Sequence, residues 1–383
     1  MRETFDVAVI GAGVFGAWTA WHLQRVGQRV VLLDPYGPAS ARASSGGQTR
    51  VIRMAYGPDA IYTRMSQRSL VQWKDFFARI ARPEWFLATG VLWMMAEADA
   101  AAARSVATLE ACGVPHQTFE AREFARRYPQ IAVPPGYRAI LEPGSGGLMA
   151  HRAVQAVVAD CLRGGAEMRI TKALPPAGDG HLADVGTPSG DTIRADRFVF
   201  ACGSWLGHVL PDVLGGRIFP TRQEVFYFGI DAGDTRFSSP ALPIWLDSAQ
   251  QYYGFPDVEG RGFKLAHDAH GEAVDPDTLE RVATPAPIAH ARAFLADRFP
   301  ALANAPLLGA EVCQYENTSN GDFVIDRHPS FDNVWIAGGG SGHGFKHGPA
   351  VGEYVAQRVL RGDEVDPRFS LAMKSLVQKR EVH

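Results

Sequence analysis

The sequence predicts a mixed α/β and α+β chain with two domains, one containing parallel strands and one built on an antiparallel sheet. Three observations support this: a strand-helix-strand pattern at residues 5–34, an alternation of aromatic and polar residues at 218–264, and a second strand, glycine loop and helix at 334–360. The 383 residues exceed what one hydrophobic core usually serves, so about two domains are expected.

The opening unit combines a strand at 5–10, a helix at about 14–26 and a strand at 29–33. A loop rich in Ser, Gly and Ala follows at 39–48, and residues 61–80 have helical periodicity. This order is typical of the start of a doubly wound, Rossmann-type domain.

Residues 83–143 differ from the opening unit in their pattern of apolar residues and in composition. A strand-like run at 90–95 precedes an alanine-rich helix at 98–111, and a Pro- and Gly-rich stretch surrounds Pro134. We assign this region mainly to the second domain. A helix at 151–164 and a buried strand at 196–200 would then return the chain to the first domain, which is therefore expected to be discontinuous.

The alternation at 218–264 is typical of an antiparallel sheet with one face toward a pocket. A helix is expected at 287–299. A buried strand at 333–337 leads into a glycine loop, and a helix at 349–360 begins beside that loop.

Composition favours small-molecule partners. The formal net charge of −3 with mixed signs gives no reason to expect a nucleic acid or an anionic membrane as partner. No apolar run approaches the roughly 20 residues of a membrane span, and glycines interrupt the apolar stretch at 7–20, so neither a membrane helix nor a signal peptide is expected. The four cysteines form no Cys-x-x-Cys pair, which fits a reducing, cytoplasmic location.

The first glycine motif predicts a dinucleotide site. Gly11, Gly13 and Gly16 follow a strand and open a helix, so the backbone can approach a pyrophosphate at the helix N-terminus. Asp34 ends the second strand, where its carboxylate can accept hydrogen bonds from both ribose hydroxyls. The site is expected to include the first residues of the helix, Val14 and Phe15.

FAD is favoured over NAD. Asp34 disfavours a 2′-phosphate, which leaves these two dinucleotides. An NAD-binding domain is usually one contiguous run of βα units, whereas here a second unit returns near the C-terminus, and its helix N-terminus could face the flavin. The predicted FAD-binding domain comprises residues 1–82, 144–217 and 310–383, and the substrate or catalytic domain comprises 83–143 and 218–309.

With these features in place, the sequence resembles the monomeric sarcosine oxidase and N-methyltryptophan oxidase branch of the D-amino-acid-oxidase-like flavoproteins. The resemblance covers nearly the whole chain in order. The motifs that carry it are residues 11–16, 48–57, 253–256, 262–264, 275–278, Cys313-x-Tyr315 with 323–326, and 341–346.

The resemblance implies that Cys313 carries FAD through a thioether. The alternative is a buried, inert thiol, the commonest fate of a lone cysteine. Cys202, in a strand-to-glycine turn, is interpreted as packing. The resemblance also places Thr49 and the residues of the last glycine loop at the cofactor, namely Gly340, Gly342, His343, Gly344, Phe345 and Lys346.

The resemblance further implies that Lys264 lies over the flavin and promotes electron transfer to dioxygen, because a fixed cation stabilises the superoxide formed first. Relatives often have a histidine shortly after this lysine. His267 is the candidate here, although a strand residue one step out of register faces the opposite side. Arg50 matches a residue near the flavin face, and Tyr253 is a further catalytic candidate.

Arg53 and Lys346 match the pair that holds the substrate carboxylate in relatives, since a guanidinium fork binds both oxygens and lysine adds a point charge. Tyr315 is expected to line the same pocket, although aromatics in alternating strands are more often core. His343 and His347 lack a matched carboxylate or cysteine ligand, so no metal is expected.

The sequence thus predicts a monomeric, FAD-dependent amine oxidase that converts a secondary or primary α-amino acid and O2 to an imine and hydrogen peroxide. A dehydrogenase or an imine-forming biosynthetic enzyme would share these motifs. A nicotinamide enzyme and a non-catalytic flavin-binding protein are the remaining alternatives.

Overall fold

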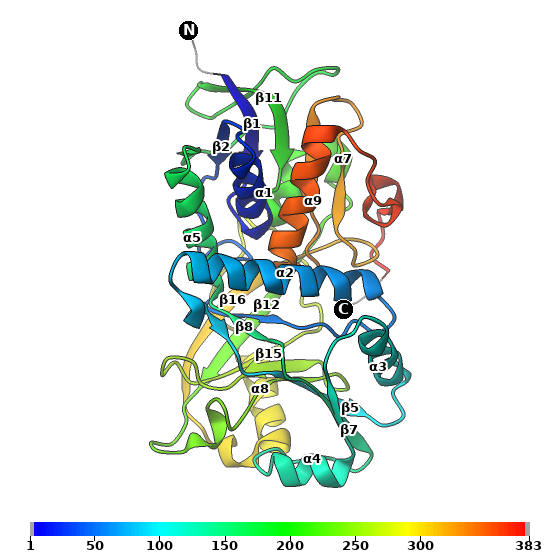
Figure 1. Cartoon of the computed structure of the whole chain (residues 1–383). Helices are drawn as coiled ribbons and strands as arrows, with labels where there is room; N and C mark the ends of the chain where they lie inside the picture. The colour runs from blue at the N-terminus through cyan, green and yellow to red at the C-terminus, as the bar shows by residue number, and fades with distance from the viewer. Residues whose placement is uncertain (1–3, 380–383) are drawn as a thin grey trace.

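The computed structural model describes residues 4–379, which form two large sheets joined by a small one. In Figure 1 the parallel strands β1, β2 and β11 occupy one end of an elongated molecule, while β5, β7 and β15 occupy the other. Helix α2, Ala60–Arg79, crosses between the two ends. The expected mixed α/β and α+β fold class is confirmed.

The first sheet has the order β17-β18-β11-β1-β2-β9, with β10 paired to β11. The strands from β18 to β9 are parallel, and β10 and β17 are antiparallel to their neighbours. The bounds are β1 Thr4–Ile10, β2 Val30–Leu33, β9 Glu167–Arg169, β10 Asp184–Gly186, β11 Thr192–Phe200, β17 Val324–Arg327 and β18 Val334–Gly338.

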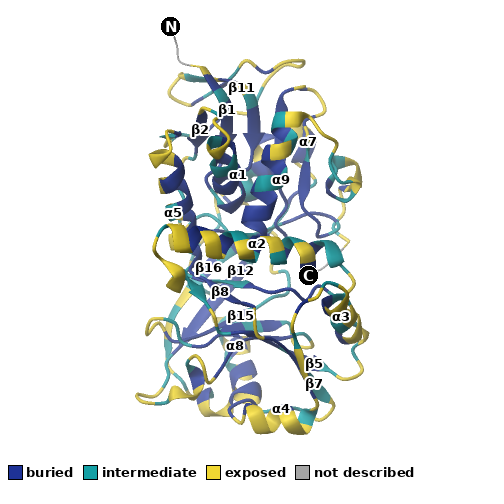
Figure 2. Cartoon of the chain, in the orientation of Figure 1, coloured by how far each residue is buried: buried dark blue, intermediate teal, exposed yellow. Residues whose placement is uncertain are grey.

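Three helices pack on one face of this sheet: α1 Val14–Arg25, α5 Ala150–Arg163 and α9 Gly348–Arg361. Helices α1 and α9 approach so closely that a Cβ added at Gly352 would lie 2.5 Å from the backbone carbonyl carbon of Trp18. The short helices α6 Leu206–Val209 and α7 Pro211–Leu214 belong to the core on the other face. Figure 2 shows the strands of this end buried and the outer face of α2 exposed.

The second sheet has the order β16-β12-β15-β14-β13-β5-β7-β6, antiparallel except for β13 and β5. Helix α8, Pro285–Arg298, packs against β12 and β15. The remaining bounds are β5 Val91–Ala96, α3 Ala100–Ala111, β6 Gln117–Phe119, α4 Ala121–Arg127, β7 Tyr137–Glu142, β12 Phe219–Phe228, β13 Ile244–Asp247, β14 Tyr252–Phe255, β15 Phe263–His267 and β16 Leu307–Asn317.

The small sheet, ordered β3-β8-β4, comprises β3 Arg50–Ile52, β8 Gly146–Leu148 and β4 Phe86–Leu87. Each predicted helix and strand has its counterpart, with ends shifted by a few residues. Strand β16 pairs with β12 from Leu307 onward, so the domain boundary placed at residue 310 lies inside a strand of the second sheet. The domain limits stay a prediction. Across residues 4–379, no helix combines the length and the apolarity that crossing a membrane requires.

Candidate active site

The turn between β1 and α1 is too tight for side chains at two of its glycines. Gly11 has φ +106°, and a Cβ there would lie 2.3 Å from the carbonyl oxygen of Ala201. A Cβ at Gly16 would lie 1.9 Å from the carbonyl oxygen of Gly11. These contacts explain the first glycine motif and hold the start of α1 against the sheet, with Gly13 as its N-cap.

Asp34 ties the end of β2 to this turn. Its carboxylate accepts hydrogen bonds from the backbone N–H groups of Ala12 at 2.9 Å and Tyr36 at 2.8 Å. Burial raises the pKa of Asp34 despite these donors. Gly11, Gly13 and Asp34 border one cavity, which we call the nucleotide cavity.

Two further cavities continue from the nucleotide cavity toward the second sheet. The first, the bridging cavity, shares Val14, Phe15 and Glu316 with the nucleotide cavity and extends to Cys313. The second, the inner cavity, shares Cys313 and Arg50 with the bridging cavity and extends to Lys346. The bridging cavity contains the last glycine loop, through Gly340, Gly342, Gly344 and Phe345. A long ligand therefore has a continuous path from Asp34 to the second sheet.

Glu316 is a residue of this path that the sequence did not reveal. Its Oε1 accepts a hydrogen bond from Gly340 N at 3.0 Å, and burial raises the pKa of this carboxyl to about 7. Its Oε2 is buried with no hydrogen-bond partner among the described residues. An orphan acceptor beside glycine backbone fits a ligand that donates from a hydroxyl group, and FAD carries such hydroxyls, so the residues present fit FAD.

Cys313 lies on β16 where the bridging and inner cavities meet. Its sulfur is 3.8 Å from Nη2 of Arg50, which also donates to the carbonyl of Ser44. The other cysteines differ in setting: burial raises the pKa of Cys161 to about 12, and Cys202 donates to the carbonyl of Ile10. Of the four, only Cys313 borders the inner cavity within the described residues.

Lys264 lies on β15, close enough to Arg50 for the two charges to interact. Its Nζ donates to the carbonyl oxygen of Thr49 at 3.1 Å and to Thr49 Oγ1 at 3.0 Å, and it lies 4.6 Å from the ring centre of Phe255. Burial, with the neighbouring Arg50, lowers the pKa of Lys264 to about 7.

Arg53 and Lys346, the predicted carboxylate pair, come together at the inner cavity. The Arg53 guanidinium lies between the rings of Tyr56 and Trp93, at 4.3 and 4.8 Å from their centres. Lys346 donates to Tyr56 Oη at 2.8 Å and to the carbonyl of His343 at 2.9 Å, and burial lowers its pKa.

Glu142, also missed from the sequence, fixes the backbone beyond Arg53. Its buried carboxylate accepts hydrogen bonds from Met54 N at 2.7 Å and Ala55 N at 3.0 Å. It also accepts a hydrogen bond from Trp93 Nε1 at 2.9 Å. The same carboxylate therefore orients both the backbone after Arg53 and the Trp93 ring that packs on the Arg53 guanidinium.

The segment after β15 changes one expectation. The ring of His267 packs 4.8 Å from Tyr252 and 5.2 Å from His290 of α8, although the residue borders the inner cavity. Asp268 instead receives a hydrogen bond from Tyr315 Oη at 2.8 Å. Both residues border the inner cavity, so His267 stays a prediction and Asp268 is an additional candidate that the alternation from Lys264 could have found.

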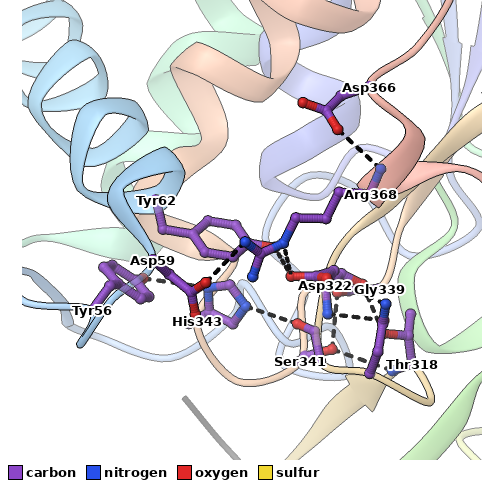
Figure 3. Close-up of polar contacts among 12 residues, drawn as sticks. Tyr56, Asp59, Tyr62, Thr318, Asp322, Gly339, Ser341, His343, Asp366 and Arg368 are labelled. Carbon is purple, nitrogen blue, oxygen red and sulfur yellow. Dashed lines mark hydrogen bonds and ion pairs between the residues drawn. The ribbon is translucent and has the colours of Figure 1, made fainter. Parts of the chain in front are cut away.

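His343 and His347 belong to a buried network of aromatic and polar side chains. Tyr56 Oη lies 3.3 Å from His343 Nδ1 and 2.8 Å from His347 Nε2. Figure 3 shows Tyr56 and His343 of this network near Asp322, which accepts hydrogen bonds from Tyr62 Oη at 2.8 Å and from Arg368 Nε at 2.7 Å. The hydrogen bonds of Tyr56 to these histidines help to orient the last glycine loop.

A glycine-cradled nucleotide cavity that continues to buried cations defines a dinucleotide-dependent oxidoreductase. The family model described as DAO, FAD dependent oxidoreductase, matches residues 6–358. The chain belongs to this family of FAD-dependent oxidoreductases, with FAD as its cofactor, and is an enzyme of the sarcosine-oxidase-like type.

Two curated relatives show the similarity. Monomeric sarcosine oxidase of Bacillus sp. (strain NS-129) is 33% identical over 373 residues, covering 94% of each chain. N-methyl-L-tryptophan oxidase of Escherichia coli O157:H7 is 28% identical, covering 92% of this chain and 94% of that protein.

Solved structures share the fold. L-proline dehydrogenase from P. horikoshii matches with a TM-score of 0.83 at 21% identity, covering 97% of this chain and 98% of that one. NikD, an amino acid oxidase essential for nikkomycin biosynthesis, matches with a TM-score of 0.80 at 20% identity, covering 99% and 100%.

Proposed function

We propose that the protein oxidises the carbon–nitrogen bond of a secondary or primary α-amino acid to an imine, with O2 reduced to hydrogen peroxide. The observation that carries this proposal is the pairing of Arg53 and Lys346 at a cavity that also contains Cys313. A buried pair of cationic side chains is suited to a carboxylate, and the curated relatives named above are oxidases of N-methyl amino acids.

In this proposal the glycines of the two loops would hold FAD, Asp34 would bind its ribose, and Cys313 would form the covalent tether. FAD supplies the hydride acceptor for the reaction. Arg53 and Lys346 orient the amino acid by its carboxylate, so that the carbon to be oxidised is held in one position.

Lys264 serves the oxygen reaction in this proposal. A buried cation that Thr49 fixes in place stabilises negative charge developing on oxygen without reorganising water. Arg50 borders the inner cavity and acts electrostatically on Lys264, so it adds a second positive charge.

The test is anaerobic bleaching of the flavin absorbance with a panel of sarcosine, N-methyl-L-tryptophan, L-proline and L-alanine. The proposal expects at least one member to bleach the cofactor, and expects air to restore the colour with formation of peroxide. No bleaching by any member would exclude an amino acid oxidase of this kind. Bleaching followed by oxygen-insensitive recovery would indicate a dehydrogenase.

A further inference from the structure

Asp268 lies where two cavities meet. Together with Arg53 and Leu246 it borders both the inner cavity and an outer one, whose wall includes Trp93 and Tyr252. It follows the last residue of β15, and Ala266, two residues before it, also borders the inner cavity. Asp268 therefore faces the site from the boundary between the inner and outer cavities.

A hydrogen-bond donor and two positive charges surround Asp268. Tyr315 donates a hydrogen bond to its Oδ1 at 2.8 Å from β16, while the positive charges of Arg53 and Lys346 act on it from across the cavity. Tyr253 of β14 and Tyr56 also face it. The Asp268 carboxylate borders both cavities, so a further positive group can approach it from there.

A site with two cations and one carboxylate is complementary to a zwitterion. The substrate carboxylate fits Arg53 and Lys346, and its ammonium group then needs a negative partner. Simple carboxylates lack that ammonium group, and simple amines lack the carboxylate, so either would leave part of the site unmatched.

We propose that Asp268 binds the substrate ammonium group and accepts its proton, so that the amine reacts in its neutral form. This inference rests on the proposed function. The N–H bond breaks and an O–H bond forms on the Asp268 carboxyl, which leaves the electron pair on nitrogen. That pair then forms the C=N bond while the adjacent C–H bond delivers its two electrons and hydrogen to the flavin as hydride.

The environment of the carboxyl suits this role. Burial raises the pKa of Asp268 to about 6, although Tyr315, Arg53 and Lys346 act to lower it. A higher pKa makes the carboxylate a better proton acceptor for an amine. Occupation of the two cations by a substrate carboxylate removes part of their lowering effect, so the proton affinity of Asp268 rises when substrate binds.

The kinetic test compares wild type with Asp268→Asn, whose amide oxygen can still accept the hydrogen bond from Tyr315. The measurement is the pH dependence of anaerobic flavin bleaching by the panel member that reduces wild type. We expect Asp268→Asn to slow bleaching at pH 7 by on the order of 10²-fold or more, the usual effect of losing a positioned base. Its rate should recover as pH rises and the amine loses its proton in solution, and Asp268→Glu should restore part of the wild-type profile.

A binding test is independent of turnover. Trimethylglycine carries a carboxylate and a permanently charged trimethylammonium group, which has no N–H group and no nitrogen lone pair. In 3,3-dimethylbutanoate an uncharged tert-butyl group of the same shape replaces the trimethylammonium group, and the carboxylate is the same. Calorimetry on the holoenzyme should show wild type preferring trimethylglycine by roughly tenfold or more, and Asp268→Asn losing this preference while retaining the affinity for 3,3-dimethylbutanoate.

The outcomes separate this inference from the proposed function. If no panel member bleaches wild type, the proposed function fails and the binding test alone decides the ammonium site. If wild type is bleached but Asp268→Asn keeps the same pH profile, or if wild type shows no preference for the cation, the role of Asp268 is overturned and the oxidase proposal stands.

Discussion

Cys313 lies at the meeting point of two cavities on the path from Asp34 to the second sheet, and we propose that it forms a covalent tether to FAD. We predict that wild-type protein precipitated with acid retains its flavin, whereas Cys313→Ser releases the flavin into the supernatant. Cys112→Ser, at the end of α3, is the matched control and should keep the tether. Free flavin in the wild-type supernatant would contradict covalent attachment.

Lys264 is predicted to act on only one of the two half-reactions. Lys264→Met removes the buried cation, so stopped-flow reoxidation by air should slow by on the order of 10²-fold, while anaerobic bleaching by substrate changes much less. Lys74→Met, on the surface of α2, should change neither rate. Equal slowing of both steps would remove the assigned role in oxygen reduction.

The raised pKa of Asp268 also has a cost in stability. Between pH 3.8 and about 6 the folded protein holds a proton that the unfolded chain has released, so the free energy of unfolding falls as pH rises through this window. Above pH 6 the loss is complete. We predict that Asp268→Asn raises the free energy of unfolding by about 1–3 kcal/mol at pH 7.5 and by little at pH 4, measured by urea denaturation. A gain that does not depend on pH would indicate another cause.

At the scale of elements, the contact between α1 and α9 sets where the last glycine loop lies relative to the first. Gly352 lies against the backbone of Trp18, which cannot yield as a flexible side chain can. We predict that Gly352→Ala lowers the free energy of unfolding by about 1–3 kcal/mol through overpacking. Gly144→Ala is the control, since nothing lies within 4 Å of a Cβ there. Thermal unfolding monitored by circular dichroism checks the difference.

The elements were largely predictable because their signals are local. The period of α2 and the alternation of β12 and β15 can be read from neighbouring residues. Alternation also disfavoured His267, yet it did not identify Asp268, because a lone Asp at a strand end is usually a solvated turn residue. Only the order of the second sheet, in which β12 lies between β15 and β16, brings Tyr315 to this carboxyl.

Arg368 connects segments from both ends of the chain. Its guanidinium pairs with Asp322 Oδ1 at 2.7 Å and with Asp59 Oδ1 at 2.8 Å, as Figure 3 shows. We predict that Arg368→Met lowers the free energy of unfolding by about 1–3 kcal/mol, because it leaves these two largely buried carboxylates without their cation. Arg361→Met, at the exposed end of α9, should change it by less than about 0.5 kcal/mol in the same denaturation experiment. Equal effects of the two changes would contradict the assignment.

The whole site could be predicted only in part. Motif matches named Cys313, Arg53 and Lys346, which border the inner cavity, and Lys264, which lies close to Arg50 and Cys313. Glu142 and Glu316 escaped notice, since each acts through backbone N–H groups that are remote in sequence. Hydrogen bonds of that kind follow from the assembled fold and leave no local pattern in the chain.

The alternation along β15 has an evolutionary consequence. Lys264 and Asp268 face the same side but lie about 13 Å apart along an extended chain. Under the roles proposed here, β15 and the residue that follows it carry the oxygen-facing and the amine-facing functions at separate positions. Natural selection, or an engineer, can thus change position 268 to accept a new class of amine while inheriting the oxygen chemistry. A deletion of one residue between Lys264 and Asp268 would turn one of the two side chains to the opposite face, so the two side chains would no longer face the same side.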